Sequence, residues 1–157
     1  MKILLVDADR TLADSINGEL EHTLVIYAPD GEVGLKIALE KQFDLIVLNW
    51  ALPEKDGLSV LKELREQKIL SPILMLIAED ALKDVIMSLD SGANDCVSKP
   101  FEMHVLIARI KALIRRSTWD LCAEIRHEHI PHATASGLST GSEEFYEYAA
   151  GRLHNDE

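Results

Sequence analysis

The stretch FDLIVLNWALPEKDG, residues 43–57, decides the fold of this chain. It begins with an apolar run, residues 45–48, which is too short for a buried helix and right for a strand covered on both faces of a parallel sheet. The run stops at Asn49, and open α/β sheets place their chemistry at the carboxyl ends of such strands. An amide is neither a nucleophile nor an acid or base near neutral pH. Any chemistry here must therefore come from the neighbours of Asn49.

Strand and helix patterns alternate five times along the chain. Apolar runs predict strands at 3–6, 23–27, 45–48, 73–77 and 95–98. Apolar residues at three- and four-residue spacing predict helices over 11–21, 33–41, 58–67, 81–90 and 101–116, with Val85, Ile86 and Leu89 of the fourth helix facing inward. Short connections and right-handed crossovers then predict an α/β fold, a doubly wound five-stranded parallel sheet with five helices.

Length and composition are those of one ordinary domain with an appendage. A chain of 157 residues can bury a core without metal or disulfide staples. No apolar run approaches the ~20 residues needed to cross a bilayer, and the N-terminal residues do not form a signal peptide, so we expect a cytoplasmic protein with no membrane contact. Cys96 and Cys122 make neither a disulfide framework nor a spaced metal motif, and we expect two free thiols.

The charge is acidic and concentrated near the C-terminus. A net charge of −11 argues against unaided binding to DNA or to anionic membrane. Residues 1–118 are predicted to form the domain and 119–157 an acidic linker and tail, because residues 120–157 carry eight acids against two Arg. Residues 142–150 fit either a short helix or a disordered tail with local helical bias. His127, His129 and His132 lie close together, but without second-shell partners we expect no metal there.

Four signatures point to one family. They are the acid after the first strand, WALPEKDG over 50–57, GANDCVSKPF over 92–101 and ARIKALIRR over 108–116. Together they resemble the receiver domain of bacterial two-component response regulators, in the OmpR/PhoB-like subfamily. The resemblance covers about residues 1–118 and implies the flavodoxin-like receiver fold.

The resemblance also implies a phosphate-accepting site, from which this chain departs at three positions. In the family, an Asp ending the third strand is the nucleophile, two adjacent acids after the first strand help to hold Mg²⁺, and a hydroxyl and a Lys contact the phosphoryl group. Those positions hold, in order, Asn49, Asp7 with Ala8, Ile77 and Lys99. We expect a degenerate site with no catalytic residue, no metal and no cofactor. Lys99 is expected to bind Asp7 or the Asn49 carbonyl and hold the site closed, the alternative being a solvated Lys99.

The resemblance further implies a switch and a dimer face. The aromatic switch position holds Cys96, so with Ile77 we expect a domain fixed near one conformation or switched by something other than phosphate. The dimer face comprises the fourth helix, fifth strand and fifth helix, where Asp95 and Arg109 are expected to pair across a two-fold axis. Val85 and Val105 replace a charge pair. Burying a valine contributes ~1.5 kcal/mol or more, against about 0 to 1 kcal/mol for a surface ion pair, which favours a phosphorylation-independent homodimer unless both valines face the domain's own core.

These features predict a receiver domain that is not an enzyme. We expect a phosphorylation-independent module for regulatory protein–protein interaction and dimerisation in signal transduction or transcriptional control, with a regulatory protein partner that the sequence does not identify. One alternative is a phosphoryl-accepting receiver that uses a displaced acid, Asp7 or Asp9. Another is the receiver part of an OmpR/PhoB-like transcription factor lacking its winged-helix domain. We expect no direct DNA binding by this chain.

Overall fold

One parallel sheet forms the centre of the molecule. The computed structural model describes residues 1–79 and 81–129, with side chains as far as residue 117. The strands are β1 (Lys2–Val6), β2 (Leu24–Ala28), β3 (Leu45–Asn49), β4 (Ile73–Ile77) and β5 (Asp95–Ser98). They pair in parallel in the order β2-β1-β3-β4-β5. The predicted doubly wound sheet is confirmed, and its order reverses direction after β1, as expected when helices cover both faces.

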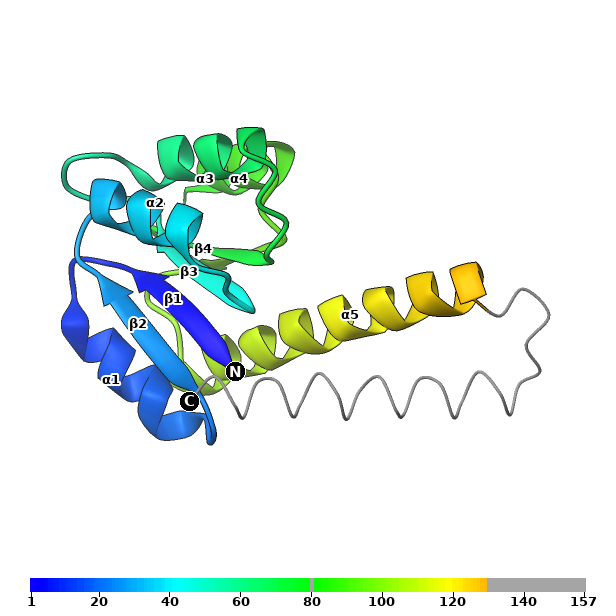
Figure 1. Ribbon diagram of the computed structural model, residues 1–157. Coiled ribbons are helices and arrows are strands. Elements are labelled where there is room, and N and C mark those ends of the chain that lie inside the picture. Colours follow the sequence, from blue (N-terminus) through cyan, green and yellow to red (C-terminus); the bar gives the residue numbers. More distant parts are fainter. Residues whose placement is uncertain (80, 130–157) are drawn as a thin grey trace.

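Five helices cover the two faces of this sheet (Figure 1). They are α1 (Arg10–Glu19), α2 (Gly31–Glu40), α3 (Gly57–Glu66), α4 (Leu82–Asp90) and α5 (Met103–His129). Helices α2, α3 and α4 lie on one face, and α1 and α5 on the other. Successive residues of a strand point to opposite faces, so Ile3 and Leu5 join the core under α1 and α5. Leu4 and Val6 join the core under α2 and α3.

Aspartate side chains begin the first three helices. Asp9 accepts a hydrogen bond from the backbone N–H of Thr11, Asp30 from that of Val33, and Asp56 from that of Ser59. Each satisfies a donor that the first helical turn leaves unpaired. Because these helices start next to the carboxyl ends of β1, β2 and β3, the caps also hold the loops at this edge of the sheet.

Two glycines bring the loop of residues 50–57 against its neighbours. A Cβ at Gly31 would lie 1.8 Å from the Lys55 carbonyl oxygen, and a Cβ at Gly57 would lie 2.1 Å from the Asn49 carbonyl oxygen. The backbone N–H of Gly57 donates to the Trp50 carbonyl over 2.8 Å. The loop therefore packs closely against the start of α2 and the end of β3. Only glycine, which has no Cβ, allows the backbone to approach this closely.

The prediction for the inward face of α4 is wrong for two of its three residues. Ile86 is 52% exposed and Leu89 is 46% exposed, whereas Ser88 is fully buried. Val85 is half-buried. The helix carries apolar residues around much of its circumference, so hydrophobic periodicity alone did not determine which side faces the sheet.

Helix α5 is longer than the periodic pattern predicts. It continues to His129, beyond the predicted helix end at 116 and the predicted domain boundary at 118. Figure 1 shows its C-terminal part projecting past the sheet. The predicted tail helix at 142–150 and His132 lie outside the described residues, as do the side chains of Cys122, His127 and His129. Within the described part of the chain, no helix has both the length and the apolar character needed to span a bilayer.

Candidate functional site

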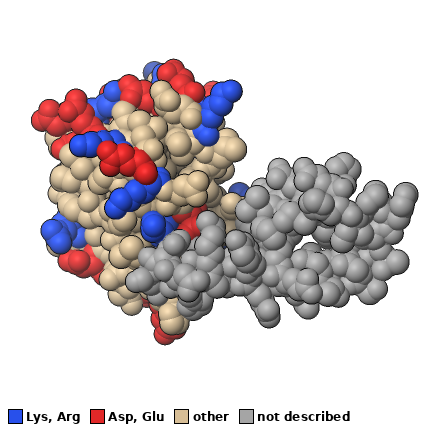
Figure 2. All heavy atoms as spheres, in the orientation of Figure 1, with Lys and Arg blue, Asp and Glu red and all other residues tan. Residues whose placement is uncertain are grey.

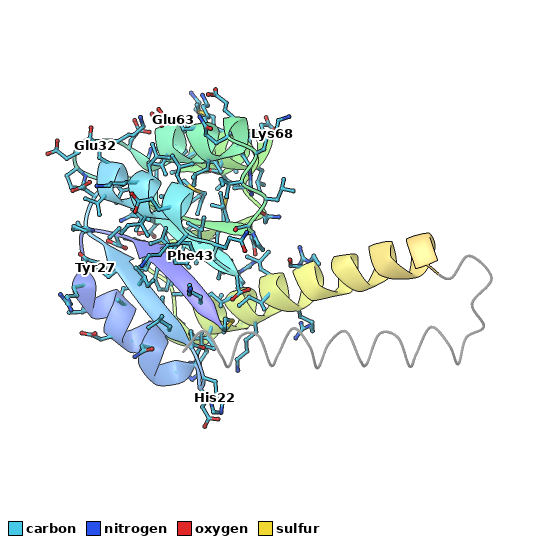
Figure 3. The ribbon with its side chains drawn as sticks, viewed as in Figure 1. His22, Tyr27, Glu32, Phe43, Glu63 and Lys68 are labelled. Atoms are coloured by element: carbon cyan, nitrogen blue, oxygen red, sulfur yellow. The ribbon has the colours of Figure 1, made fainter. Side chains whose placement is uncertain are left out.

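The carboxyl edge of the sheet gathers three of the predicted site residues. Asp7 directly follows β1, Asn49 ends β3, and Lys99 directly follows β5. Strands β1 and β3 are neighbours in register, with Val6 opposite Leu48, so Asp7 and Asn49 come to lie side by side. In Figure 3, Tyr27 and Glu32 mark this edge, and His22 lies at the opposite end of the sheet.

Asp7 is a buried carboxylate whose two oxygen atoms have different partners. It is only 2% exposed. Its Oδ1 accepts a hydrogen bond from the Asp9 backbone N–H over 3.0 Å and another from Asn49 Nδ2 over 3.2 Å. Its Oδ2 accepts no hydrogen bond from the described residues, but lies 3.6 Å from Lys99 Nζ. That separation is too long for a hydrogen bond and within the range of an ion pair.

Asn49 connects Asp7 to the loop that follows β3. The residue is 8% exposed. Its side-chain NH₂ group donates to Asp7, and its Oδ1 accepts from the Ala51 backbone N–H over 3.3 Å. With the amide oriented in this way, both its nitrogen and its oxygen form hydrogen bonds, and the buried Asp7 carboxylate receives a donor. Asn49 therefore acts here as a hydrogen-bond bridge, a role for which an amide is suited.

The two remaining site positions, Ala8 and Ile77, have no side-chain oxygen to offer a ligand. Ile77 is fully buried at the end of β4, and Ala8 is exposed. The backbone carbonyl of Ile77 accepts a hydrogen bond from the Lys99 N–H over 2.7 Å, which fixes the start of the segment carrying Lys99. Among the predicted site residues the structure thus brings together Asp7, Asn49 and Lys99 as polar contacts, while Ile77 contributes through its backbone and its packing.

Residues at the rim are occupied with structural contacts. The Asp9 carboxylate accepts from both the backbone N–H and the hydroxyl of Thr11, over 3.0 and 2.6 Å. The hydrogen bond from the Thr11 hydroxyl is the main cause that lowers the pKa of Asp9. The Arg10 guanidinium lies 5.8 Å from the centre of the Tyr27 ring, and burial is the main cause that raises the pKa of the Tyr27 hydroxyl. The Asp9 side chain thus serves as the cap of α1.

Comparison with known proteins identifies this arrangement. Residues 3–111 match the family model of the response regulator receiver domain. The chain belongs to the response regulator receiver family. Its fold is shared by the receiver domain of the Francisella response regulator 1452, which is 35% identical with a TM-score of 0.69, over 74% of this chain and 98% of that one.

Curated relatives of this receiver domain are longer regulators. The response regulator protein PmrA of Pseudomonas aeruginosa is 40% identical over 129 residues, which make up 81% of this chain and 58% of PmrA. The alkaline phosphatase synthesis transcriptional regulatory protein PhoP of Bacillus subtilis is 45% identical over 118 residues, 74% of this chain and 49% of PhoP. The chain thus spans about half the length of the curated relatives it matches.

A divalent cation does not fit the residues at this receiver site. Mg²⁺ is held by oxygen ligands, usually including one or two carboxylates. Here Asn49 turns its NH₂ group towards Asp7, and the free Asp7 oxygen faces the Lys99 ammonium group. A metal ion would have to approach that positive charge. Within the described residues, no group of three Asp, Glu, His or Cys side chains is placed to hold a metal ion.

The predicted switch residue packs beneath α4. Cys96 of β5 is half-buried, and its thiol lies 4.0 Å from the Val85 carbonyl oxygen. Burial is the main cause that raises the pKa of the Cys96 thiol, so the thiol stays protonated near neutral pH. Its side chain packs against the core under α3, which makes Cys96 a packing residue in this arrangement.

The predicted dimer residues lie on the surface formed by α4, β5 and α5. Asp95 and Arg109 form an ion pair within the single chain, Oδ2 to Nη1 at 2.9 Å. The cause is their proximity, since α5 runs alongside β5. Their pairing across a two-fold axis stays a prediction. Val105 is 42% exposed. Neither it nor Val85 is among the described residues that pack against the two core clusters.

Sequence reasoning missed a larger apolar surface on α4. Exposed side chains there are Leu82, Ile86, Met87 and Leu89, of which Leu82 is 71% exposed. The signal in the sequence was present, because Leu82, Ile86 and Leu89 recur at helical spacing opposite the polar Ser88. Such a stripe normally predicts the buried face, and the predicted inward set accordingly includes Ile86 and Leu89.

Proposed function

We propose that this chain is an atypical receiver domain of the OmpR/PhoB-like type that works without phosphorylation. It acts as a regulatory protein–protein interaction and dimerisation module in signal transduction or transcriptional control, and it is not an enzyme. The observation that carries the proposal is the hydrogen bond from Asn49 Nδ2 to Asp7 Oδ1. At the position of the family's nucleophile, the Asn49 side chain instead donates a structural hydrogen bond to the buried Asp7 carboxylate.

The chemistry of the site supports this proposal. Formation of an acyl phosphate needs a carboxylate nucleophile, and an amide cannot take that role. Ile77 places an apolar side chain where a hydroxyl would donate to the phosphoryl oxygens. The rival acids are already engaged, since Asp7 is buried against Asn49 and Lys99 and Asp9 caps α1.

A small phosphodonor tests the proposal directly. Incubation with acetyl phosphate and Mg²⁺ is expected to leave the intact mass of the protein unchanged. A different receiver domain that has all the phosphate-accepting groups, treated in parallel as the positive control, should gain about 80 Da, the mass of one phosphoryl group. A stoichiometric gain that disappears in Asp7→Asn or Asp9→Asn would instead establish a displaced phosphoacceptor and overturn the proposal.

The dimerisation part of the proposal rests on exposed apolar side chains on either side of β5. Leu82, Ile86, Met87 and Leu89 of α4 and Val105 of α5 are each more than two-fifths exposed. β5 is also one of the two edge strands of the sheet. Apolar contacts of this kind do not depend on phosphate, so a dimer formed through them is expected to be constitutive.

Lysine substitutions test this dimer. Val85→Lys combined with Val105→Lys is expected to shift the protein from dimer to monomer in multi-angle light scattering, because the substitutions place charge in an apolar interface. Leu70→Lys is the matched control, since Leu70 is 87% exposed in the loop between α3 and β4 and its change should leave the mass unaltered. An unaltered mass of the double variant together with a lower melting temperature would place the valines in the core.

The charge pattern agrees with a protein partner better than with a nucleic acid. Figure 2 shows acidic and basic side chains interspersed on the face it draws, with no single-sign patch among the described residues of that face. Direct DNA binding needs clustered Lys and Arg to neutralise phosphates, and the whole chain carries a net charge of −11. The proposed function therefore involves a protein partner and no direct DNA binding by this chain.

A further inference from the structure

The buried Asp7 Oδ2 atom is the unusual feature of the site. A carboxylate oxygen removed from water normally accepts hydrogen bonds, because desolvating it without a partner is unfavourable. Asp7 Oδ1 has two donors, but Oδ2 has none among the described residues. The positive group that faces it is Lys99 Nζ at 3.6 Å, on a side chain that is 39% exposed.

The charges at the site balance without a metal ion. With acids in the places of Ala8 and Asn49, three carboxylates would face one ammonium group, an excess of two negative charges that suits a divalent cation. Here Asp7 and Lys99 alone carry charge among the five site positions, one of each sign. A divalent cation would have to displace or repel the Lys99 ammonium group, whose charge also helps to lower the pKa of the Asp9 carboxyl at the rim.

We propose that the Lys99 ammonium group is the built-in counter-ion of this receiver domain and takes the place of a divalent metal ion beside Asp7. This inference rests on the proposed function, in which the site is structural. The backbone hydrogen bond from Lys99 to Ile77 holds the start of its segment at the end of β4. Asn49 holds Asp7 Oδ1, so that Oδ2 stays turned towards the ammonium group. The carboxyl ends of β1, β3 and β5 are thereby joined in an arrangement independent of Mg²⁺.

Thermal unfolding in the presence and absence of Mg²⁺ tests the inference. The melting temperature of the wild-type protein is expected to be the same with about 10 mM MgCl₂ as with choline chloride of equal ionic strength, since a ligand stabilises only the state that binds it. Lys99→Met leaves Asp7 as a buried charge without a counter-ion. Its melting temperature is expected to fall by about 5 °C and to be partly recovered by MgCl₂ but not by choline chloride.

Two further variants separate charge from packing. Lys99→Arg keeps the positive charge, so its melting temperature, like that of the wild-type protein, is expected not to change with MgCl₂. Asp7→Asn combined with Lys99→Met removes both charges, so it should melt above Lys99→Met alone and show no response to MgCl₂. If Lys99→Met does not fold, the wild-type protein still decides the matter: the electron paramagnetic resonance signal of free Mn²⁺ should not decrease when the protein is added at an equal concentration.

Several results would overturn the inference. They are a wild-type melting temperature that rises with MgCl₂, a Mn²⁺ signal that decreases with added wild-type protein, or a Lys99→Met variant as stable as the wild type in the absence of Mg²⁺. Mg²⁺ binding by a protein that acetyl phosphate leaves unmodified would remove this inference and leave the proposed function standing. A phosphoryl adduct on the wild-type protein would remove the proposed function itself.

Discussion

Asn49→Asp is expected to lower the free energy of unfolding by about 3 kcal/mol in the absence of divalent cations, because it leaves an uncompensated buried charge. Asn49 Nδ2 lies 3.2 Å from Asp7 Oδ1, and both residues are more than nine-tenths buried. The substitution replaces this donor by a second carboxylate, and one Lys99 cannot balance two negative charges. Urea denaturation in a buffer containing a chelator measures the change.

The matched control exchanges the two side chains. Asp7→Asn combined with Asn49→Asp keeps one carboxylate, one amide and Lys99, and it should recover most of the stability that Asn49→Asp alone loses. Asn49→Asp is also expected to remain unlabelled by acetyl phosphate, because Ala8 and Ile77 still lack the groups that bind metal and phosphoryl oxygens. An Asn49→Asp protein as stable as the wild type would show that the Asp7–Asn49 contact contributes little, and robust labelling would show that Ala8 and Ile77 matter less than their chemistry indicates.

Gly57→Ala is expected to destabilise the protein by about 3 kcal/mol, at the upper end of what overpacking typically costs. The added Cβ would lie 2.1 Å from the Asn49 carbonyl oxygen and 2.8 Å from the Trp50 Cα. Both are backbone atoms, so the end of β3 or the start of α3 would have to move. That movement would also displace Asn49 from Asp7. Urea denaturation measures the stability, and the NMR signals of the Asn49 side-chain NH₂ group report the displacement.

Gly18→Ala provides the comparison, because it makes the same chemical change without a close contact. Gly18 belongs to α1, and a Cβ there would have no atom of the described residues within 4 Å apart from its chain neighbours and the backbone of its own helix. Alanine there should stabilise the protein by up to about 1 kcal/mol through its higher helix propensity. Equal effects of the two substitutions would contradict the close approach of Gly57 to β3.

Most of the fold followed from local patterns in the sequence. Apolar runs such as Ile73–Ile77 were predicted as strands buried on both faces, and all five residues of β4 are buried. A wholly apolar run of this length fits only between two helical layers. The inward face of α4 was not predictable in the same way. This nine-residue helix carries apolar residues around much of its circumference, so more than one of its sides could face the sheet.

The site was predicted in its composition but not in its geometry. Asp7 and Asn49 are 42 positions apart in the chain, and Asn49 and Lys99 are 50 positions apart. Only the sheet order brings the three residues to one edge. The sequence offered Lys99 either Asp7 or the Asn49 carbonyl as its partner. The structure pairs it with Asp7 Oδ2 and directs the Asn49 amide to Oδ1.

The sequence by itself determined which side-chain groups are missing from the site, because Ala8, Asn49 and Ile77 have no carboxylate or hydroxyl in any conformation. It also determined the alternation of strands and helices, since hydrophobic periodicity is a local property. Tertiary structure alone decided that Asn49 bridges Asp7 to the following loop, that Asp95 meets Arg109 within the chain, and that α4 turns its apolar stripe to solvent. These outcomes depend on contacts between segments that are distant in the chain. The packing of those segments sets which side chains come into contact and how they are oriented.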